Sequence, residues 1–153
     1  MKNIIYTLII CTLGISACGN DDDGSGAQLE MDIQLITDYL DDNSLTAERT
    51  ESGLHFIVSR EGSGPNPTIQ DEVTVRYRGY FLDGTEFDAT EGNNTISFPL
   101  RDVIQGWQEG IPKFKAGGSG ILLIPSALGY GTSGFLSVPP NTVLLFDIDL
   151  VSF

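Results

Sequence analysis

The sequence predicts an α+β domain in which an antiparallel β-sheet is half-wrapped around one short helix. Its 18 glycines and 7 prolines among 153 residues indicate many turns, as in a domain rich in β-strands. Several segments of the later chain alternate apolar and polar residues with a period of two, which is typical of strands with one buried face. This length suffices for one domain with a substantial core, and an apolar fraction of 41% is ordinary for a globular protein.

A stretch before the predicted sheet has the spacing of a helix. Leu29, Ile33, Ile36 and Leu40 recur every three or four residues, so residues 28–41 are predicted to form a helix with one apolar stripe. The stripe is too short for a stable coiled coil. We expect it to act as a pad against the domain or as a spacer.

The predicted strands follow along the rest of the chain. In the clearest of them, Val73, Val75 and Tyr77 share one face, while the residues between them are polar and share the other. Asp83-Gly84 then gives a strong signal for a tight turn. The predicted strands are residues 54–58, 72–80, 96–98, 120–124 and 143–150, and a second short helix is predicted over residues 105–113.

The composition argues against several kinds of function. The 8 basic and 21 acidic residues give a net charge of −13, which disfavours nucleic acid because its phosphates would be repelled. The two cysteines, Cys11 and Cys18, both lie near the N-terminus, and His55 is the single histidine. We therefore expect no disulfide, thiol nucleophile, metal site or histidine-based triad in the folded domain. We assign His55 no role beyond structure.

The N-terminus has the pattern of an export signal. Lys2 is followed by an apolar run over residues 4–17, which is shorter than the ~20 residues needed to span a bilayer. The run ends in Ile15-Ser16-Ala17-Cys18, which resembles the lipobox of bacterial lipoproteins. That resemblance implies cleavage before Cys18 and lipid modification of this cysteine. A short anchor that stays uncleaved is the alternative interpretation.

A flexible tether is predicted after Cys18, because Asp21-Asp22-Asp23 lies among glycines and a serine and cannot bury apolar area. This acidic stretch resembles the surface-export signal of lipoproteins from Bacteroidetes-type bacteria, and the alternative is a plain linker. The predicted segments are a signal peptide at 1–17, the lipidated cysteine and tether at 18–27, a helix and linker at 28–50, and the folded domain at 51–153. We expect the domain at 51–153 to fold without residues 19–50.

Five blocks in the last two thirds of the chain form a specific pattern. They are Val75-Arg76-Tyr77-Arg78-Gly79, the hairpin Asp83 to Asp88, Val103 to Gly110, Ile124-Pro125 with Tyr130-Gly131, and Pro139-Pro140-Asn141 through Phe146-Asp147. In this order and near this spacing, they resemble the FKBP family of peptidyl-prolyl cis-trans isomerases, from about Gly53 to Phe153.

The resemblance implies an FKBP-like fold and catalysis of X-Pro isomerisation in exported or envelope proteins, with no cofactor. Proline-containing polypeptides are the implied partners, and tacrolimus- or rapamycin-type macrolides are implied ligands. The implied catalytic residues are Tyr77, Asp88, Trp107 and Tyr130, and the implied substrate-binding residues are Phe87, Ile96, Val103, Ile104, Val138 and Phe146. Ile96 stands where many members have a phenylalanine, so that wall is expected to lack a second aromatic ring.

The chemistry of X-Pro isomerisation agrees with these residues even when the family resemblance is set aside. The amide rotates over a barrier of about 18–20 kcal/mol and no bond breaks, so an isomerase needs a pocket that prefers the twisted amide rather than a nucleophile. The alternatives are a binding or chaperone module on the same fold with little isomerase activity, and a lipoprotein that binds a glycan or nutrient. With a lipid on Cys18, we expect the protein to be anchored in the cell envelope, in the outer membrane and either periplasmic or surface-exposed.

Overall fold

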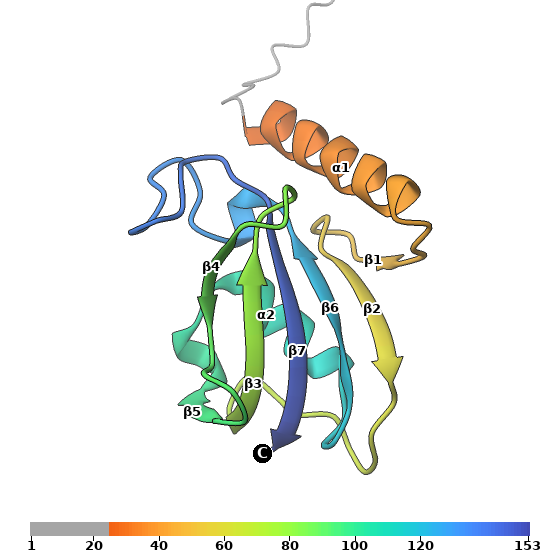
Figure 1. Cartoon of the computed structure of the whole chain (residues 1–153), viewed down its shortest axis with the longest axis vertical. Coiled ribbons are helices and arrows are strands. Elements are labelled where there is room, and N and C mark those ends of the chain that lie inside the picture. The colour runs from red at the N-terminus through yellow and green to blue at the C-terminus, as the bar shows by residue number, and fades with distance from the viewer. Residues whose placement is uncertain (1–24) are drawn as a thin grey trace, which may run out of the picture.

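A computed structural model describes residues 25–153 of the chain. Its strands form one antiparallel sheet in the order β1-β2-β6-β7-β3-β4, and β5 pairs with the other half of β3 (Figure 1). The strands are β1 (Glu48–Arg49), β2 (His55–Arg60), β3 (Glu72–Tyr80), β4 (Glu86–Ala89), β5 (Ile96–Pro99), β6 (Ser119–Ile124) and β7 (Leu144–Ser152), and the helices are α1 (Ser25–Asp42) and α2 (Gln105–Gly110). The predicted α+β fold with a half-wrapped sheet is confirmed.

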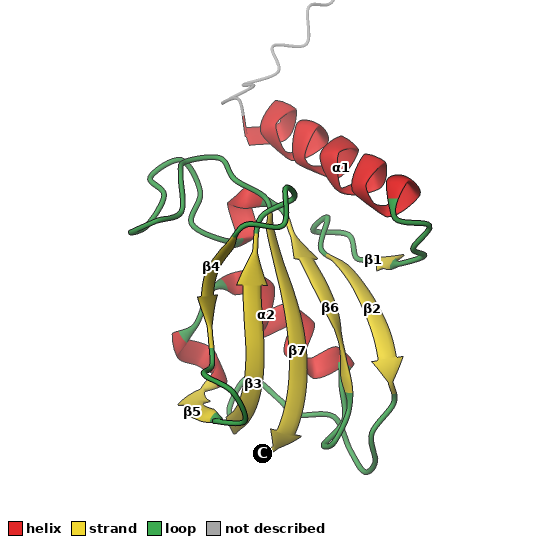
Figure 2. Ribbon diagram, in the orientation of Figure 1, coloured by secondary structure: helices red, strands yellow, loops and turns green. Residues whose placement is uncertain are grey.

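The main core lies between the sheet and α2, which crosses one face of it (Figure 2). Central strand β7 shows how the sequence builds this face: Leu144, Phe146, Ile148 and Leu150 alternate with residues that point the other way, and all four are buried. We call this the inner face of the sheet.

Two glycines let α2 approach the inner face closely. A Cβ added at Gly110 would lie 2.6 Å from Leu122 Cδ1, and one added at Gly106 would collide with Ile124. Because both positions lack a side chain, the helix backbone rests on β6. This contact fixes the depth at which the next residue, Trp107, enters the core.

Helix α1 lies across one end of the sheet and covers part of its outer face (Figure 1). Ile36 and Leu40 are buried in a second apolar cluster with Tyr80, Leu123 and Leu145 from the central strands. The apolar stripe is therefore a pad against the domain, one of the two roles expected for it. The helix begins at Ser25, so the last three residues of the predicted tether are helical.

The predicted boundary at residue 51 falls between two strands that pair with each other. β1 pairs with β2 through Glu48 with Phe56 and Arg49 with His55, so the sheet extends to the N-terminal side of that boundary. Independent folding of residues 51–153 stays a prediction, and the packing of α1 and β1 argues against it.

The predicted signal peptide, Cys18 and the acidic residues of the tether lie outside the described residues. Within residues 25–153, no helix has the length and apolarity needed to cross a membrane. The same part of the chain holds no group of histidine, cysteine or acidic side chains that could bind a metal ion.

Candidate active site

A cavity of about 210 Å³ opens on the inner face, between β3, β4, β5, the start of α2 and the loop that carries Tyr130. The structure brings together every predicted catalytic and substrate-binding residue except Val138. The lining residues are Tyr77, Phe87, Asp88, Ile96, Phe98, Val103, Ile104, Trp107, Tyr130 and Phe146.

Trp107 lies at the bottom of the cavity, where its side chain is 5% exposed. Tyr77 and Phe146 meet the indole edge-on, with ring centroids 5.1 Å from it in both cases, and Phe98 packs at 5.4 Å. The indole N–H is buried and has no hydrogen-bond partner among the described residues. Packing rather than hydrogen bonding therefore holds this ring, and edge-to-face geometry is an arrangement that aromatic pairs favour.

Gly79 on β3 makes room for one wall of the cavity. A Cβ at this position would lie 2.8 Å from both Phe87 and Phe146. The absence of a side chain lets these two rings meet edge-on, with centroids 5.5 Å apart. A glycine in a central strand thus has a packing reason here.

The Tyr77 hydroxyl donates a hydrogen bond to Asp88 Oδ2 at 2.5 Å, across the pairing of β3 with β4. Burial, this hydrogen bond and the charge of Asp88 raise the pKa of Tyr77 above its ordinary value. Burial and the same charge also raise the pKa of Tyr130. Both phenols therefore keep their protons at neutral pH and can act only as neutral hydrogen-bond donors or acceptors.

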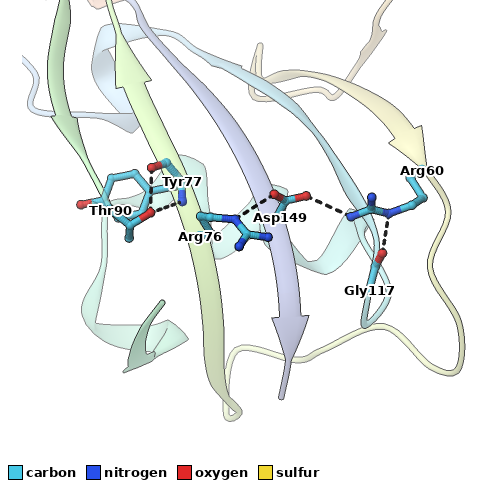
Figure 3. A network of polar contacts seen from close by, with 6 residues as sticks. All are labelled: Arg60, Arg76, Tyr77, Thr90, Gly117 and Asp149. Atoms are coloured by element: carbon cyan, nitrogen blue, oxygen red, sulfur yellow. Dashed lines mark hydrogen bonds and ion pairs between the residues drawn. The ribbon is translucent and has the colours of Figure 1, made fainter. Parts of the chain in front are cut away.

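The backbone of Tyr77 is held by Thr90, which follows β4. The Thr90 hydroxyl lies 3.2 Å from both the N–H and the carbonyl oxygen of Tyr77 (Figure 3). The Thr90 N–H also donates to that carbonyl, at 3.0 Å. These contacts tie the end of β4 to β3. They keep Asp88 within reach of the Tyr77 hydroxyl.

Two further donors border the cavity. Ile104 immediately precedes α2, and its N–H has no hydrogen-bond partner within the described part of the chain. The Tyr130 hydroxyl likewise makes no hydrogen bond to another residue of that part. A carbonyl group placed in the cavity can therefore find a donor on either of two sides.

One sequence expectation about the walls is corrected, and one wall residue was not predicted. Phe98 lines the cavity as a further aromatic ring; a period of two from Ile96 puts it on the same face of β5, and that signal was available in the sequence. Val138, which was expected to bind substrate, does not line the cavity. It is buried in the main core because its backbone pairs with Phe135 in a tight turn that folds its side chain inward.

The same turn exposes the side chains of Phe135 and Leu136. Phe135 is 55% exposed and stacks on Tyr130, with ring centroids 5.2 Å apart. Leu136 is 91% exposed and has a φ of 49°, a left-handed conformation that is costly for leucine. Neither side chain folds back onto the core, so both remain available beside the cavity.

A larger, open hollow of about 700 Å³ lies on the outer face of the sheet. Its arginines are already paired: Asp149 bridges Arg60 at 3.0 Å and Arg76 at 3.3 Å, and Arg78 contacts Glu86 at 2.9 Å (Figure 3 shows the first two pairs). Among residues 25–153, no arginine that lines this hollow is left to hold an anion. The aromatic cavity is the better candidate for a binding site.

Residues 64–151 match the family described as FKBP-type peptidyl-prolyl cis-trans isomerase. An FKBP-type isomerase named FkpA from Buchnera aphidicola (subsp. Schizaphis graminum) is 43% identical over 105 residues, which cover 67% of this chain and 42% of the relative. The peptidyl-prolyl cis-trans isomerase Mip from Coxiella burnetii is 40% identical over 103 residues, or 66% of this chain and 45% of that protein. The match thus spans less than half the length of these curated relatives.

Solved structures resemble this chain over a longer stretch. The crystal structure of FkpA from Escherichia coli has a TM-score of 0.72 at 34% identity, covering 83% of this chain and 63% of that one. A peptidyl-prolyl cis-trans isomerase from Pseudomonas syringae pv. tomato has a TM-score of 0.71 at 28% identity, covering 87% of this chain and 98% of that one. Both structural matches extend beyond residues 64–151.

Proposed function

This chain belongs to the FKBP-type peptidyl-prolyl cis-trans isomerase family, and from that premise we propose that it catalyses X-Pro isomerisation in exported or envelope polypeptides. The observation that carries the proposal is the aromatic cavity with Trp107 at its bottom and the Tyr77–Asp88 pair at its rim. The cavity joins an apolar floor to a few polar groups. That combination is what a site for a proline ring and its two neighbouring carbonyls requires.

The chemistry proposed here is preferential binding of the twisted amide. In the planar amide, conjugation places partial charges on oxygen and nitrogen, and water stabilises them; the twisted amide has lost this conjugation. A dry aromatic wall therefore disfavours the planar state more than the twisted one. A rate gain of three to five decades requires only about 4–7 kcal/mol, which a few such contacts can supply.

Each group has a distinct proposed task. Trp107 supports the proline ring from below, and Tyr77, Phe87 and Phe146 surround it. The Ile104 N–H and the Tyr130 hydroxyl donate to substrate carbonyls, which holds the chain on both sides of the rotating bond. Asp88 keeps the Tyr77 hydroxyl directed toward β4, so that the ring stays fixed as a wall.

The test is a proline-limited refolding assay on wild type and on a Trp107→Ala, Asp88→Ala double variant. We expect wild type to accelerate the slow phase without added metal or cofactor and the folded double variant to lose most of that acceleration. The matched control is Arg76→Ala, which removes a polar side chain from the outer face. Full activity in the folded double variant would remove the site assignment. Suppressed aggregation without acceleration would support a binding module on the same fold.

For substrate preference, we propose that large apolar residues before proline are favoured over acidic ones. Support comes from Phe135 and Leu136, which are exposed beside Tyr130, and from the net charge of −13, which repels acidic peptides more strongly at low salt. A peptide series that varies only this residue, run on wild type and on a Phe135→Ala, Leu136→Ala variant, tests the idea. A flat wild-type profile, or a preference that survives the double change, contradicts it.

We also propose that tacrolimus- or rapamycin-type macrolides occupy the same cavity. Its aromatic lining and its two available donors support this, as does membership of the family. Fluorescence of the single tryptophan, Trp107, should change on titration with the macrolide because the ring forms the floor. Unchanged fluorescence together with uninhibited isomerase activity would contradict the proposal.

For the location, we propose a lipid anchor on Cys18 in the cell envelope, with the domain attached to the outer membrane and either periplasmic or surface-exposed. The support is the Ile15-Ser16-Ala17-Cys18 block after a short apolar run. Mass spectrometry of protein from the native host should find a diacylated or triacylated N-terminal cysteine. A Cys18→Ser variant should leave the membrane fraction, and an unmodified N-terminus or unchanged partitioning would refute the anchor.

A further inference from the structure

A carboxylate on α1 is completely buried, although it lies far from the cavity in sequence. Asp32 is 0% exposed and accepts hydrogen bonds from the Ser126 N–H at 2.7 Å and the Ser126 hydroxyl at 2.6 Å, 94 residues along the chain. Gln28 donates a third bond at 2.7 Å from one turn earlier in the helix. A buried charge is costly unless it is fully hydrogen-bonded. The donors on Ser126 and Gln28 must therefore keep their positions around the Asp32 carboxylate.

Ser126 connects this carboxylate to the residues around Tyr130. It begins a short 3-10 helix (Ser126–Leu128), and its carbonyl oxygen accepts the N–H groups of Gly129 at 3.0 Å and Gly131 at 2.8 Å. Those two glycines flank Tyr130 directly. Ser126 thus donates to the Asp32 carboxylate through its N–H and hydroxyl. Its carbonyl oxygen accepts hydrogen bonds from both neighbours of Tyr130.

Helix α1 gives Asp32 a rigid base. One turn further on, Ile36 is fully buried against the outer face of the sheet, and Leu40 follows it into the same cluster. On the other side, Leu29 and Ile33 approach Gly53, where an added Cβ would lie 2.9 Å from Leu29. The helix is fixed to the sheet at several points, so the position of Asp32 is set independently of the Tyr130 loop, which we define as residues 129–138.

From these contacts we infer that Asp32 is a positioning residue, through which α1 sets the place of Tyr130 over the cavity. This inference rests on the proposed isomerase function. Without the carboxylate, the Ser126 N–H and hydroxyl lose their acceptor, and the Tyr130 loop loses its connection to α1. The Tyr130 hydroxyl and the Phe135 ring stacked on it would then sample more positions, and substrate binding would weaken.

Helix α1 contains a matched control. Asp38 accepts a hydrogen bond from Gln34 at 2.7 Å, the same i to i+4 pair with the same length as Gln28 with Asp32, but exposed and without a contact to the loop. Asp38→Ala therefore removes an equal charge and an equal helix pair. Any difference between Asp32→Ala and Asp38→Ala reports the contact with Ser126.

The experiment combines amide hydrogen exchange with steady-state isomerase kinetics on the full mature chain. In Asp32→Ala, we expect exchange at Gly129 and Gly131 to rise at least about tenfold, while Leu122 and Ile148 in the central sheet stay protected. The kcat/KM for a short X-Pro peptide should fall about three- to tenfold, mainly through KM, because a carbonyl donor is less well placed. Asp38→Ala should change neither quantity.

Two milder variants keep the inference testable if Asp32→Ala does not fold. Asp32→Asn retains one acceptor oxygen and should recover part of the loop protection, and Ser126→Ala removes only the hydroxyl donor and should show a smaller loss. Unchanged exchange at Gly129 and Gly131 in the folded variants would overturn the inference, as would an equal rise at every sheet amide. Wild type without isomerase activity, but with loop exchange that responds to Asp32, would instead refute the proposed function and leave the contact intact.

Discussion

The two faces of the sheet are built from the same strands, yet they differ in which hydrogen-bonding and charged groups lack a partner. On the inner face, aromatic rings surround a cavity of about 210 Å³, and two donors at its border have no partner among residues 25–153. On the outer face, arginines and carboxylates pair with one another around a hollow of about 700 Å³. The larger hollow is the poorer site, because its arginines are already paired with carboxylates. Unsatisfied groups, more than volume, indicate where a ligand binds.

The outer face is itself divided, since α1 covers its apolar end and leaves its charged part in solvent. Removing residues 1–49 should expose the cluster around Tyr80, Leu123 and Leu145 and take away the side chains of Ile36 and Leu40. At about 1.5–3 kcal/mol for each buried aliphatic side chain, we expect a loss of about 3–6 kcal/mol in the free energy of unfolding. Urea unfolding of the full chain and of the chain that lacks residues 1–49 measures this difference in stability. Equal unfolding midpoints would contradict the prediction and would support a domain boundary at residue 51.

Gly79 gives the sharpest test of the inner face. Gly79→Ala should push Phe87 and Phe146 apart, lower the free energy of unfolding by about 1–3 kcal/mol and reduce isomerase activity. Arg78→Ala, at the neighbouring position that faces the other way, should leave activity unchanged. Thermal unfolding together with a peptide assay would show both effects. Equal activity of Gly79→Ala and Arg78→Ala would contradict the assignment of the active site to the inner face.

The paired charges of the outer face should matter little. Arg76 and Asp149 are each about one-third exposed, so Arg76→Ala should cost at most about 1 kcal/mol of stability, and less at high salt. Asp149→Ala should cost slightly more, because this carboxylate serves Arg60 as well. Urea unfolding at low and high salt measures both. A loss of isomerase activity in either variant would show that the outer face takes part in the function.

The pH dependence should be weak near neutrality on both faces. Tyr77 donates to Asp88 on the inner face and Tyr80 donates to Asp147 at 3.0 Å on the outer one, and burial together with these carboxylates raises the pKa of both tyrosines. We expect isomerase activity to stay flat between about pH 6 and 9, because the phenols remain protonated.

The same raised pKa values predict an alkaline loss of stability. Tyrosines in the unfolded chain ionise near pH 10, so the contribution is fully present below about pH 10 and is lost as the pH rises toward the folded values. Tyr77→Phe and Tyr80→Phe should each weaken this loss, but only Tyr77→Phe should alter kinetics. Unfolding midpoints that do not move between pH 9 and 11 would contradict the assignment.

Local periodicity predicted the central strands, and the resemblance to FKBP-type isomerases named most of the residues that line the cavity. Alternation located β3 and β7 to within about two residues, and a short apolar run located β6. Phe98 was not predicted as a site residue, although its spacing of two from Ile96 places it on the same face of β5.

The remaining differences depend on tertiary contacts that periodicity does not encode. Val138 points inward because the chain reverses direction in a tight turn that contains Leu136. Leu136 has a left-handed backbone conformation there, which is not expected for a leucine. The short strand β1 exists only because β2 offers it an edge. The sequence does mark Asp32 as unusual, because this acidic residue lies in the apolar stripe of the helix between Leu29 and Ile36. Its role as a hydrogen-bond acceptor could not be predicted, because the donor is Ser126, 94 residues away.

The central claim is that the aromatic cavity of the inner face binds the X-Pro segment. The most direct measurement is NMR titration of the isotope-labelled mature chain with an unlabelled X-Pro peptide. We predict that the largest shifts occur at the Trp107 indole N–H, the Ile104 amide and the Tyr130 amide, while Arg76 and Arg78 on the outer face stay unchanged. Shifts centred on Arg76 and Arg78, or no saturable shift at Trp107, would contradict the account.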